Sequence, residues 1–246
     1  MNLIKTNTEI KFIKKSASIL KKVKKIVRQA IKPGISLLQL DKLAYDSIIK
    51  LGGEPAFLNQ YGFPNTACIS LNEEVIHGIP NNRVLKIGDL IKVDLGVIYK
   101  EYYSDSAFTM AVGDVDETSK KIIKIAKSAF YAGLNSIKPG ARVGDIEYAI
   151  GQEIKKNGFF TPKEFTGHGI GRRLHEEPII RNDGQKNTGI YLEDNMVICI
   201  EPIIVQKSNQ IFIKKDKWTV VAASKLNAAH YEHTVLIQKG KGIILT

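Results

Sequence analysis

The chain has little cysteine and no long hydrophobic run. Its two cysteines, Cys68 and Cys199, lie in apolar, strand-like segments, and we expect reduced core thiols of a cytoplasmic protein rather than a disulfide. No apolar run approaches the length of a membrane span, and the first residues lack the hydrophobic stretch of a signal peptide. These absences exclude a disulfide scaffold and indicate that the protein has no membrane partner.

Acidic residues are also scarce relative to basic ones, and the net charge is +11. Lysines cluster only within residues 14–25, where Ile10, Ile13, Ala17 and Leu20 repeat at helical spacing. The pattern predicts an amphipathic helix with outward lysines, preceded by a capping box in residues 6–9. A solvated helix face is the simpler interpretation of this charge; contact with RNA or the ribosome surface is the alternative.

The chain repeats itself at long range. The tetrapeptide Ile-Lys-Pro-Gly occurs at residues 31–34 and again at residues 137–140, and the apolar positions after each copy keep step. Each copy interrupts a helical pattern and precedes a second helix. With 246 residues and 43% hydrophobic content, we expect one domain over residues 1–246. Its pseudo-symmetric halves would span roughly residues 10–110 and 115–240.

Several metal-ligand residue types end or interrupt apolar segments. Asp94 follows one such run, Glu201 follows another, and Glu232 lies inside a third, while His168 lies in a predicted glycine-flanked loop. A predicted hairpin would bring Asp94 and Asp105 to the same end of a sheet. An unpaired buried carboxylate costs several kcal/mol, so converging acids need cations. Two divalent metals are one answer, and four separate buried salt bridges are the alternative.

This set of donors indicates a particular chemistry. One imidazole and four carboxylates, without thiolate, favour Mn, Fe(II) or Co over structural zinc. Paired metals can hold a bridging water, lower its pKa and polarise a carbonyl. His77 and His175 lie beside these acids and are candidate donors to a developing oxyanion. The glycine run at residues 167–171 lacks the spacing of a dinucleotide fingerprint, and no phosphate loop or nucleophile elbow is present.

Five ordered motifs together resemble the type I methionine aminopeptidases. They occupy residues 72–80, 166–171, 175–178, 200–202 and 231–234. The resemblance extends over essentially the whole chain, in the short bacterial form of the family. It implies the α+β pita-bread fold, with two pseudo-twofold-related halves around a central curved antiparallel sheet and helices outside. It also implies removal of the initiator methionine from nascent polypeptides that carry a small second residue.

The resemblance assigns roles to individual residues. Two divalent metal ions (Co, Mn or Fe(II)) would be held by Asp94, Asp105, His168, Glu201 and Glu232. His77 and His175 match substrate-contacting histidines, and Glu201 matches the proposed general base. In the implied mechanism a metal-bridging hydroxide attacks the methionyl carbonyl, Glu201 accepts the proton, and His175 helps to stabilise the oxyanion. His77 would orient the scissile amide.

The methionine pocket departs from the family pattern at several positions. Cys68 and Trp218 match its lining, and Phe63 keeps an aromatic ring where a tyrosine is usual. The departures are Phe57, Gln60, Leu174 and Gly96, the last standing where a threonine often supports the first aspartate.

His230 occupies a position where glutamine is usual. Strand alternation places it on the same face as Glu232, so we expect it to donate a ring N–H to Glu232 or to a metal-bound water. A core histidine without effect on the metals is the alternative.

Three other functions share some of these features. A proline-specific peptidase of this fold usually carries an extra N-terminal domain that 246 residues cannot accommodate. A non-catalytic RNA binder would fit the basic charge but would not need all five ligands. A binuclear phosphoesterase could use the same ligand types, but the motif order argues against it. We expect a cytoplasmic monomer whose partners are the N-termini of nascent polypeptides.

Overall fold

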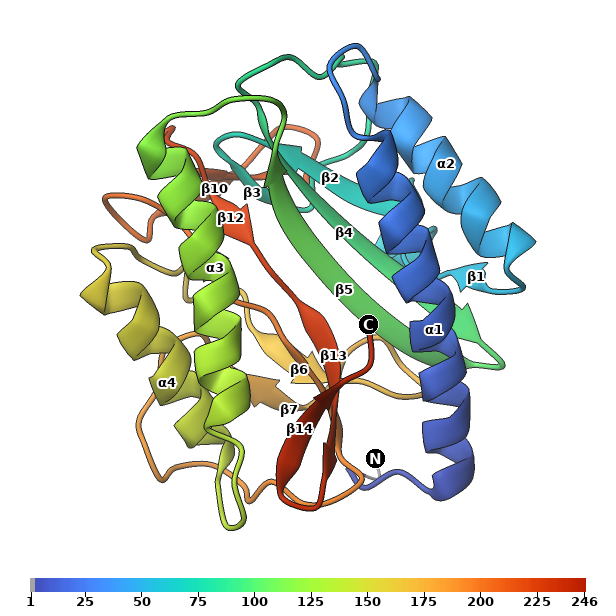
Figure 1. Ribbon diagram of the computed structural model, residues 1–246, viewed down its shortest axis with the longest axis vertical. Helices are drawn as coiled ribbons and strands as arrows, with labels where there is room; N and C mark the ends of the chain where they lie inside the picture. Colours follow the sequence, from blue (N-terminus) through green and yellow to red (C-terminus); the bar gives the residue numbers. More distant parts are fainter. Residues whose placement is uncertain (1–2) are drawn as a thin grey trace.

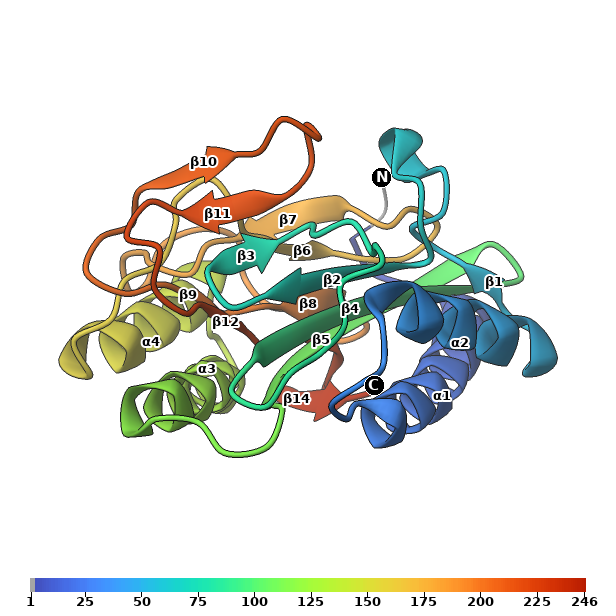
Figure 2. The same ribbon diagram turned by 90° about the horizontal axis from the view of Figure 1, so that it is seen from above.

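Two helix pairs cover the same side of the strands (Figures 1 and 2). The computed structural model describes residues 3–246, so Met1 and Asn2 of the predicted domain lie outside the described part. The first pair is α1 (Asn7–Ala30) and α2 (Leu37–Lys50), and the second is α3 (Glu117–Asn135) and α4 (Val143–Lys156). No helix within the described residues is both long and apolar enough to cross a membrane.

The first α-helix forms as its sequence predicts. The Thr6 side chain accepts from the Glu9 backbone N–H, and the Glu9 carboxylate accepts from the Thr6 backbone N–H, which completes the capping box. The apolar positions face the core and the lysines outside it are exposed, with one exception. Lys24 is partly buried, and its Nζ donates to Ser106 Oγ at 2.6 Å.

The strands form four antiparallel sheets. The largest has the order β14-β13-β8-β6-β7, and a four-stranded sheet has the order β1-β4-β2 with β5 paired to β4. Two smaller sheets have the orders β10-β11-β3 and β12-β9. The strand bounds are β1 Glu54–Pro55, β2 Ala67–Leu71, β3 Glu74–Ile76, β4 Leu90–Tyr99, β5 Tyr102–Ala111, β6 Gly167–Gly169, β7 Glu176–Ile180, β8 Val197–Ile200, β9 Ile203–Ile204, β10 Ile211–Ile213, β11 Val220–Ala222, β12 Ala229–His230, β13 His233–Gln238 and β14 Lys241–Ile244. The α+β class is confirmed.

The sequence repeat corresponds to repeated local structure. Each Ile-Lys-Pro-Gly segment connects the two helices of a pair, and its glycine is left-handed, with φ +94° at Gly34 and +80° at Gly140. Short antiparallel bridges follow at matching places, Ser36 with Val84 and Arg142 with Tyr191. Both halves therefore use the same turn to fold a helix pair back onto the strands.

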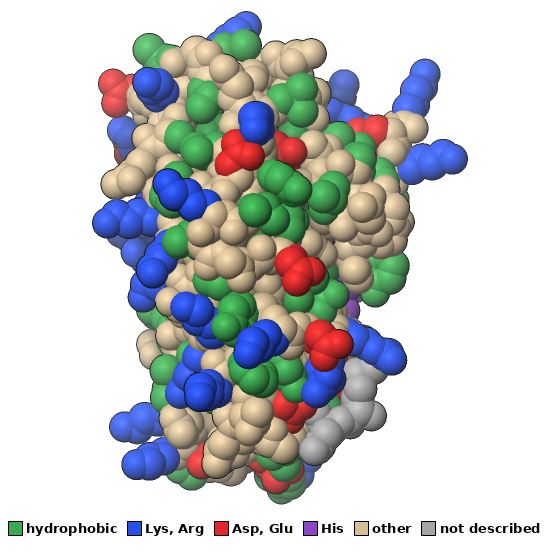
Figure 3. Space-filling view, turned by 90° about the vertical axis from the view of Figure 1, so that its right-hand side faces the viewer, with side chains coloured by type: hydrophobic (Ala, Val, Ile, Leu, Met, Phe, Trp, Pro, Cys, Tyr) green, Lys and Arg blue, Asp and Glu red, His purple; other side chains and the backbone are tan. Residues whose placement is uncertain are grey.

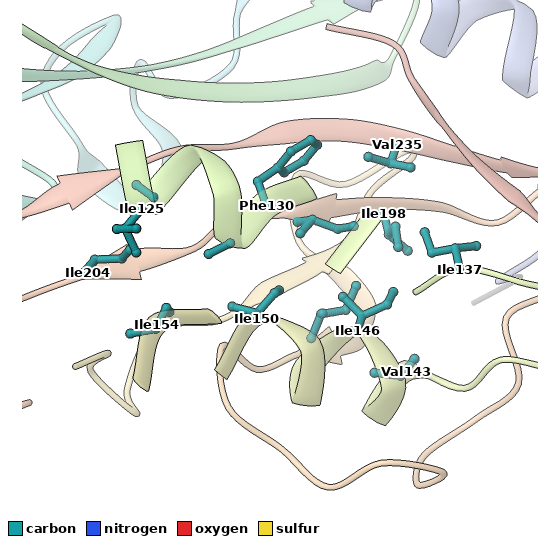
Figure 4. Packing of buried hydrophobic residues seen from close by; sticks show 14 of the residues in the cluster. Ile125, Phe130, Ile137, Val143, Ile146, Ile150, Ile154, Ile198, Ile204 and Val235 are labelled. Atoms are coloured by element: carbon teal, nitrogen blue, oxygen red, sulfur yellow. The ribbon is translucent and has the colours of Figure 1, made fainter. Parts of the chain in front are cut away.

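The core under α3 and α4 fixes the strands of the largest sheet. Ile125 and Phe130 from α3 and Ile146 from α4 pack against Ile198 of β8 and Val235 of β13 (Figure 4). These side chains are almost completely buried, and burying each one stabilises the fold by roughly 1.5–3 kcal/mol. β8 and β13 therefore have a rigid support on the helix side.

Two expectations about strand ends are wrong. β4 does not end at Asp94 but continues to Tyr99, because the apolar pattern resumes after this single acid. Asp94 pairs with Ala107, and Gly96 pairs with Asp105, so the two aspartates are diagonal neighbours in the middle of a long ladder rather than at its end. They still share one face. His168 lies in β6 rather than in a loop.

Candidate metal centre and substrate pocket

A cavity of about 670 Å³ opens beside the strands, and all five candidate metal ligands line it. Each comes from a different element. Asp94 lies in β4, Asp105 in β5 and His168 in β6, while Glu201 follows β8 and Glu232 lies between β12 and β13. Residues separated by more than 130 positions thus meet in one wall, as the predicted convergence requires.

Backbone contacts hold Glu232 in the gap between two strands. Its N–H donates to the Ala107 carbonyl at 3.0 Å, and its carbonyl accepts from Ser106 Oγ at 2.7 Å. Thr234 accepts from the Asp105 N–H and donates to the Asp105 carbonyl. The β5 residues around Asp105 are therefore tied to the segment that carries Glu232, which fixes the two carboxylates relative to each other.

The ligand atoms lie close enough to share cations. Carboxylate oxygens of Asp94, Asp105 and Glu232 lie within 4.8 Å of one another. His168 Nε2 is 3.6 Å from Glu201 Oε1 and 4.0 Å from Asp105 Oδ2. The Gly169 carbonyl accepts from His168 Nδ1, which leaves Nε2 directed at the acids.

Separate salt bridges do not explain this cluster. Within residues 3–246, no lysine or arginine forms an ion pair with any of the four acids at 4.0 Å or less. One oxygen each of Asp94, Asp105 and Glu232 is buried without a hydrogen-bond partner among the described residues. Buried charges without partners are strongly unfavourable, so these oxygens fit divalent cations.

The pKa values of the clustered residues also favour a bound cation. Burial, followed by the charges of Glu232, Asp94 and Glu201, raises the pKa of Asp105 well above its usual value. Burial likewise raises the pKa of the other three acids. A bound cation would counteract both effects, because its positive charge stabilises the deprotonated carboxylates and lowers their pKa values. Burial lowers the pKa of His168 to about 3, so its imidazole is neutral, the form that binds metals.

His77 and His175 lie on the cavity wall beside the cluster. His77 follows β3 with a left-handed φ of 56°, and its ring meets the Phe165 ring edge-to-face at 5.5 Å. Burial lowers the pKa of His77 to about 4. The His175 ring lies 4.5 Å from that of His168 and stacks on Tyr61 at 6.2 Å. Both predicted substrate histidines therefore reach the cavity that contains the acids.

An aromatic side pocket adjoins the cluster. Phe63 and Trp218 meet edge-to-face at 5.1 Å, and Cys68 lines the same cavity. Phe165 and Tyr61 also line it but were not among the predicted residues. Phe165 lies in a loop directly before the motif at residues 166–171, whereas Tyr61 lies in the short 3-10 helix Gln60–Gly62, next to the departure Gln60. An aromatic residue beside a position already singled out was the only signal that could have identified them.

Two departures from the family pattern compensate each other. A Cβ built on Gly96 would lie 2.6 Å from Phe57 Cε1 and 2.7 Å from Ala56 Cβ. Such contacts are far inside the van der Waals distance. The Phe57 ring therefore occupies the space that a larger residue at position 96 would need.

His230 lies between two of the acids. Its Nε2 is 3.4 Å from Glu201 Oε2 and 3.9 Å from Glu232 Oε2, and it has no hydrogen-bond partner among the described residues. Burial lowers its pKa, so the ring is neutral and carries one N–H. Asn182 was also missed: its Nδ2 donates to the Glu201 carbonyl at 3.0 Å.

Comparisons with known proteins agree with this geometry. The model of metallopeptidase family M24 matches residues 11–239. The chain is 44% identical to a methionine aminopeptidase of Borreliella burgdorferi, covering 99% of this chain and 97% of the relative. It is 41% identical to that of Helicobacter pylori, covering 99% and 98%.

Solved structures give the same result. A methionine aminopeptidase from Thermotoga maritima superposes with a TM-score of 0.97 at 36% identity, covering 99% of this chain and 98% of that one. A prolidase from Pyrococcus furiosus superposes with a TM-score of 0.79 at 27% identity. This chain covers only 65% of the prolidase.

Proposed function

The chain belongs to metallopeptidase family M24 and resembles its methionine aminopeptidases over its whole length, and we propose that it removes the initiator methionine from nascent polypeptides. The predicted pita-bread fold is confirmed by the same comparisons. One observation supports the proposal above all: four buried carboxylates and a neutral imidazole converge in the cavity whose side pocket is aromatic. We further propose that residues 1–246 act as one catalytic domain.

The acids and His168 fit divalent cations. We propose two ions, Mn, Fe(II) or Co, held by the residues that the resemblance implied: Asp94, Asp105, His168, Glu201 and Glu232. Such cations would stabilise negative charge on a carbonyl oxygen and lower the pKa of a bound water. The donors are oxygen-rich, which suits these metals.

The protein's own residues perform the remaining steps. Glu201 accepts the proton of the attacking water: its side chain is 12% exposed and lines the cavity, whereas Asp105 is 5% and Glu232 2% exposed, and its position matches the general base that the resemblance implied. His175 lies at the cavity wall and donates a hydrogen bond to the carbonyl oxygen of the scissile bond. His77, neutral because its pKa is about 4, offers one N–H to orient the scissile amide.

The side pocket selects the first residue of the substrate. The perpendicular rings of Phe63 and Trp218 and the Cys68 side chain enclose an apolar space suited to an unbranched thioether. His77 crowds the region beyond the scissile bond, which favours a small second residue.

A comparison of three substrates tests the proposal. The purified protein should cleave a Met-Ala-containing peptide, and should leave a Gly-Pro dipeptide and a phosphate ester intact. Chelation should abolish the activity, and added Mn²⁺ or Co²⁺ should restore it. Faster cleavage of Gly-Pro than of the Met-Ala peptide would favour the activity named for the Pyrococcus furiosus structure instead.

The basic helix gives a candidate contact with the ribosome. Lys14, Lys15 and Lys21 of α1 are exposed, and Figure 3 shows many basic side chains on the face that includes α1 and α2. We propose that a cytoplasmic monomer contacts ribosomes through this helix. Co-sedimentation should weaken for the Lys14→Gln/Lys15→Gln variant but not for Lys124→Gln/Lys127→Gln, a matched pair exposed on α3. Equal binding by both variants would contradict the helix assignment.

A further inference from the structure

Cys199 lies directly beneath the acidic cluster. It occupies β8 between two strands, with His168 of β6 opposite it on one side and Thr234 of β13 on the other. Its side chain is fully buried and forms no disulfide, and its sulfur lies 3.7 Å from Thr234 Oγ1. Cross-strand partners project from the same face of a sheet, so Cys199 and His168 point toward the same region.

The strand period supports this placement. Residues two apart in a strand share a face, and Glu201 follows Cys199 by two positions. The Cys199 sulfur, a ring nitrogen of His168 and a carboxylate oxygen of Glu232 lie within 4.8 Å of one another. The ligand atoms of a tetrahedral zinc ion lie about 3.3–3.7 Å apart, so modest side-chain rotation would bring these three atoms to coordinating distance of one ion.

A second observation indicates a ligand at this place. Glu232 is 1% exposed, and its Oε1 has no hydrogen-bond partner among the described residues. His168 Nδ1 is occupied by the Gly169 carbonyl, so Nε2 is its available donor atom. A neutral imidazole, a carboxylate and a thiol with these positions form a mixed nitrogen, oxygen and sulfur set.

We propose that His168, Cys199 and Glu232 form an alternative site for a thiophilic cation, Zn²⁺ or Cd²⁺, overlapping the oxygen-rich centre. The inference rests on the proposed metal centre, because two of its ligands are shared. Soft thiolate selects such cations, whereas the carboxylates alone suit Mn²⁺. On binding, the S–H bond breaks, the sulfur–metal bond forms, and the proton passes to solvent.

The overlap has a functional consequence. A cation held by Cys199 withdraws His168 and Glu232 from the oxygen-rich set, so it excludes the arrangement that the proposed reaction uses. Zn²⁺ or Cd²⁺ in excess should therefore displace Mn²⁺ and lower turnover.

Spectroscopy of the metal-loaded protein tests the site without relying on activity. Co²⁺ and Cd²⁺ are titrated into metal-free wild-type, Cys199→Ser and Cys68→Ser proteins, and sulfur-to-metal charge-transfer absorption is recorded. We expect the absorption in the wild type and in Cys68→Ser, where the substituted thiol belongs to none of the donor groups. Cys199→Ser should lose the absorption and bind Cd²⁺ on the order of 100-fold more weakly, while its Mn²⁺ affinity changes less than about threefold.

Each result separates the two proposals. If wild-type protein binds the cations but shows no sulfur absorption, the thiol is no ligand and this inference is overturned, while the oxygen-rich centre stands. If wild-type protein binds no cation at all, the proposed metal centre fails. A ¹¹³Cd nuclear magnetic resonance shift of the wild-type complex, which reports sulfur ligation, decides the question even if Cys199→Ser does not fold.

Discussion

The Phe57 ring occupies the space beside Gly96, so substitution of either residue should change the packing of the other. Gly96→Thr places a Cβ 2.6 Å from Phe57 Cε1 and 2.7 Å from Ala56 Cβ, so the ring or the strand must move. Overpacking of this kind costs about 1–3 kcal/mol. A protein of this size should lose roughly 2–4 °C of melting temperature for each kcal/mol. Gly96→Thr alone should therefore melt about 2–12 °C lower.

The partner substitution has the opposite defect. Phe57 is 6% exposed, and Phe57→Cys leaves a cavity that costs about 2–4 kcal/mol. In the double variant, the threonine side chain occupies part of that cavity, so the two effects should couple favourably by about 0.5–3 kcal/mol. Urea unfolding of the wild type, both single variants and the double variant measures this coupling.

A glycine in the other half of the fold supplies the control. A Cβ on Gly133 of α3 would lie 2.8 Å from Ile150 Cγ1, a comparable crowding with no contact to Phe57. Gly133→Ala and Phe57→Cys should therefore add within about 0.5 kcal/mol. If Gly96→Thr and Phe57→Cys are equally additive, the two departures are independent and the reasoning is refuted.

Four further predictions concern catalysis, specificity and charge. Glu201→Gln should lower kcat by about 10²–10⁴-fold if Glu201 is the base; near-normal turnover would exclude that role. His230→Gln should shift metal affinity about 10–100-fold at unchanged fold, and identical metal titrations would exclude contact with the ligands. Met-Ala peptides should be cleaved far faster than Met-Lys peptides, with norleucine accepted at a rate lower by roughly 10–200-fold; equal rates for Met-Ala and Met-Lys would refute the small-residue preference. Burial lowers the pKa of Lys24 from 10.5 to about 8. Between pH 8 and 10.5 the Lys24 amine is therefore protonated in the unfolded chain but not in the folded one, so the free energy of unfolding should rise by up to about 3 kcal/mol over this range. Urea unfolding of Lys24→Met should lack that part of the rise.

Local signals made α1 and the repeated turns predictable. The capping residues Thr6 and Glu9 and the glycines Gly34 and Gly140 act within a few positions of themselves, so their sequence determines their structure. The end of β4 was not predictable in this way. Asp94 is a polar residue inside a strand, and its side chain lines the cavity together with the other acids; only the pairing with β5 shows that the ladder continues.

The acids of the candidate site were predictable, whereas some of the residues around them were not. A carboxylate in an apolar run requires a partner once it is buried, so the sequence alone indicates a site there. Asn182 and Phe165 belong to the site only through their contacts with Glu201 and His77, which depend on the fold. Cys199 is the clearest case. Its sequence context indicates a core residue, which the burial bears out, but its approach to Glu232 depends on the register of three strands. Such register is set by the whole sheet.

The acids themselves join stability to function. Burial raises the pKa of each acid, and neighbouring carboxylates add to that effect at Asp105, Glu201 and Glu232, so folding without cations requires protonation or leaves unpaired charge. The packed core beneath β8 and β13 holds the strands in place against this repulsion. A cation that binds only the folded chain stabilises it by about 2.7 kcal/mol at a hundredfold excess over its Kd. The residues that make the centre reactive are therefore those whose burial is least favourable without metal, so metal binding supports both the fold and the chemistry.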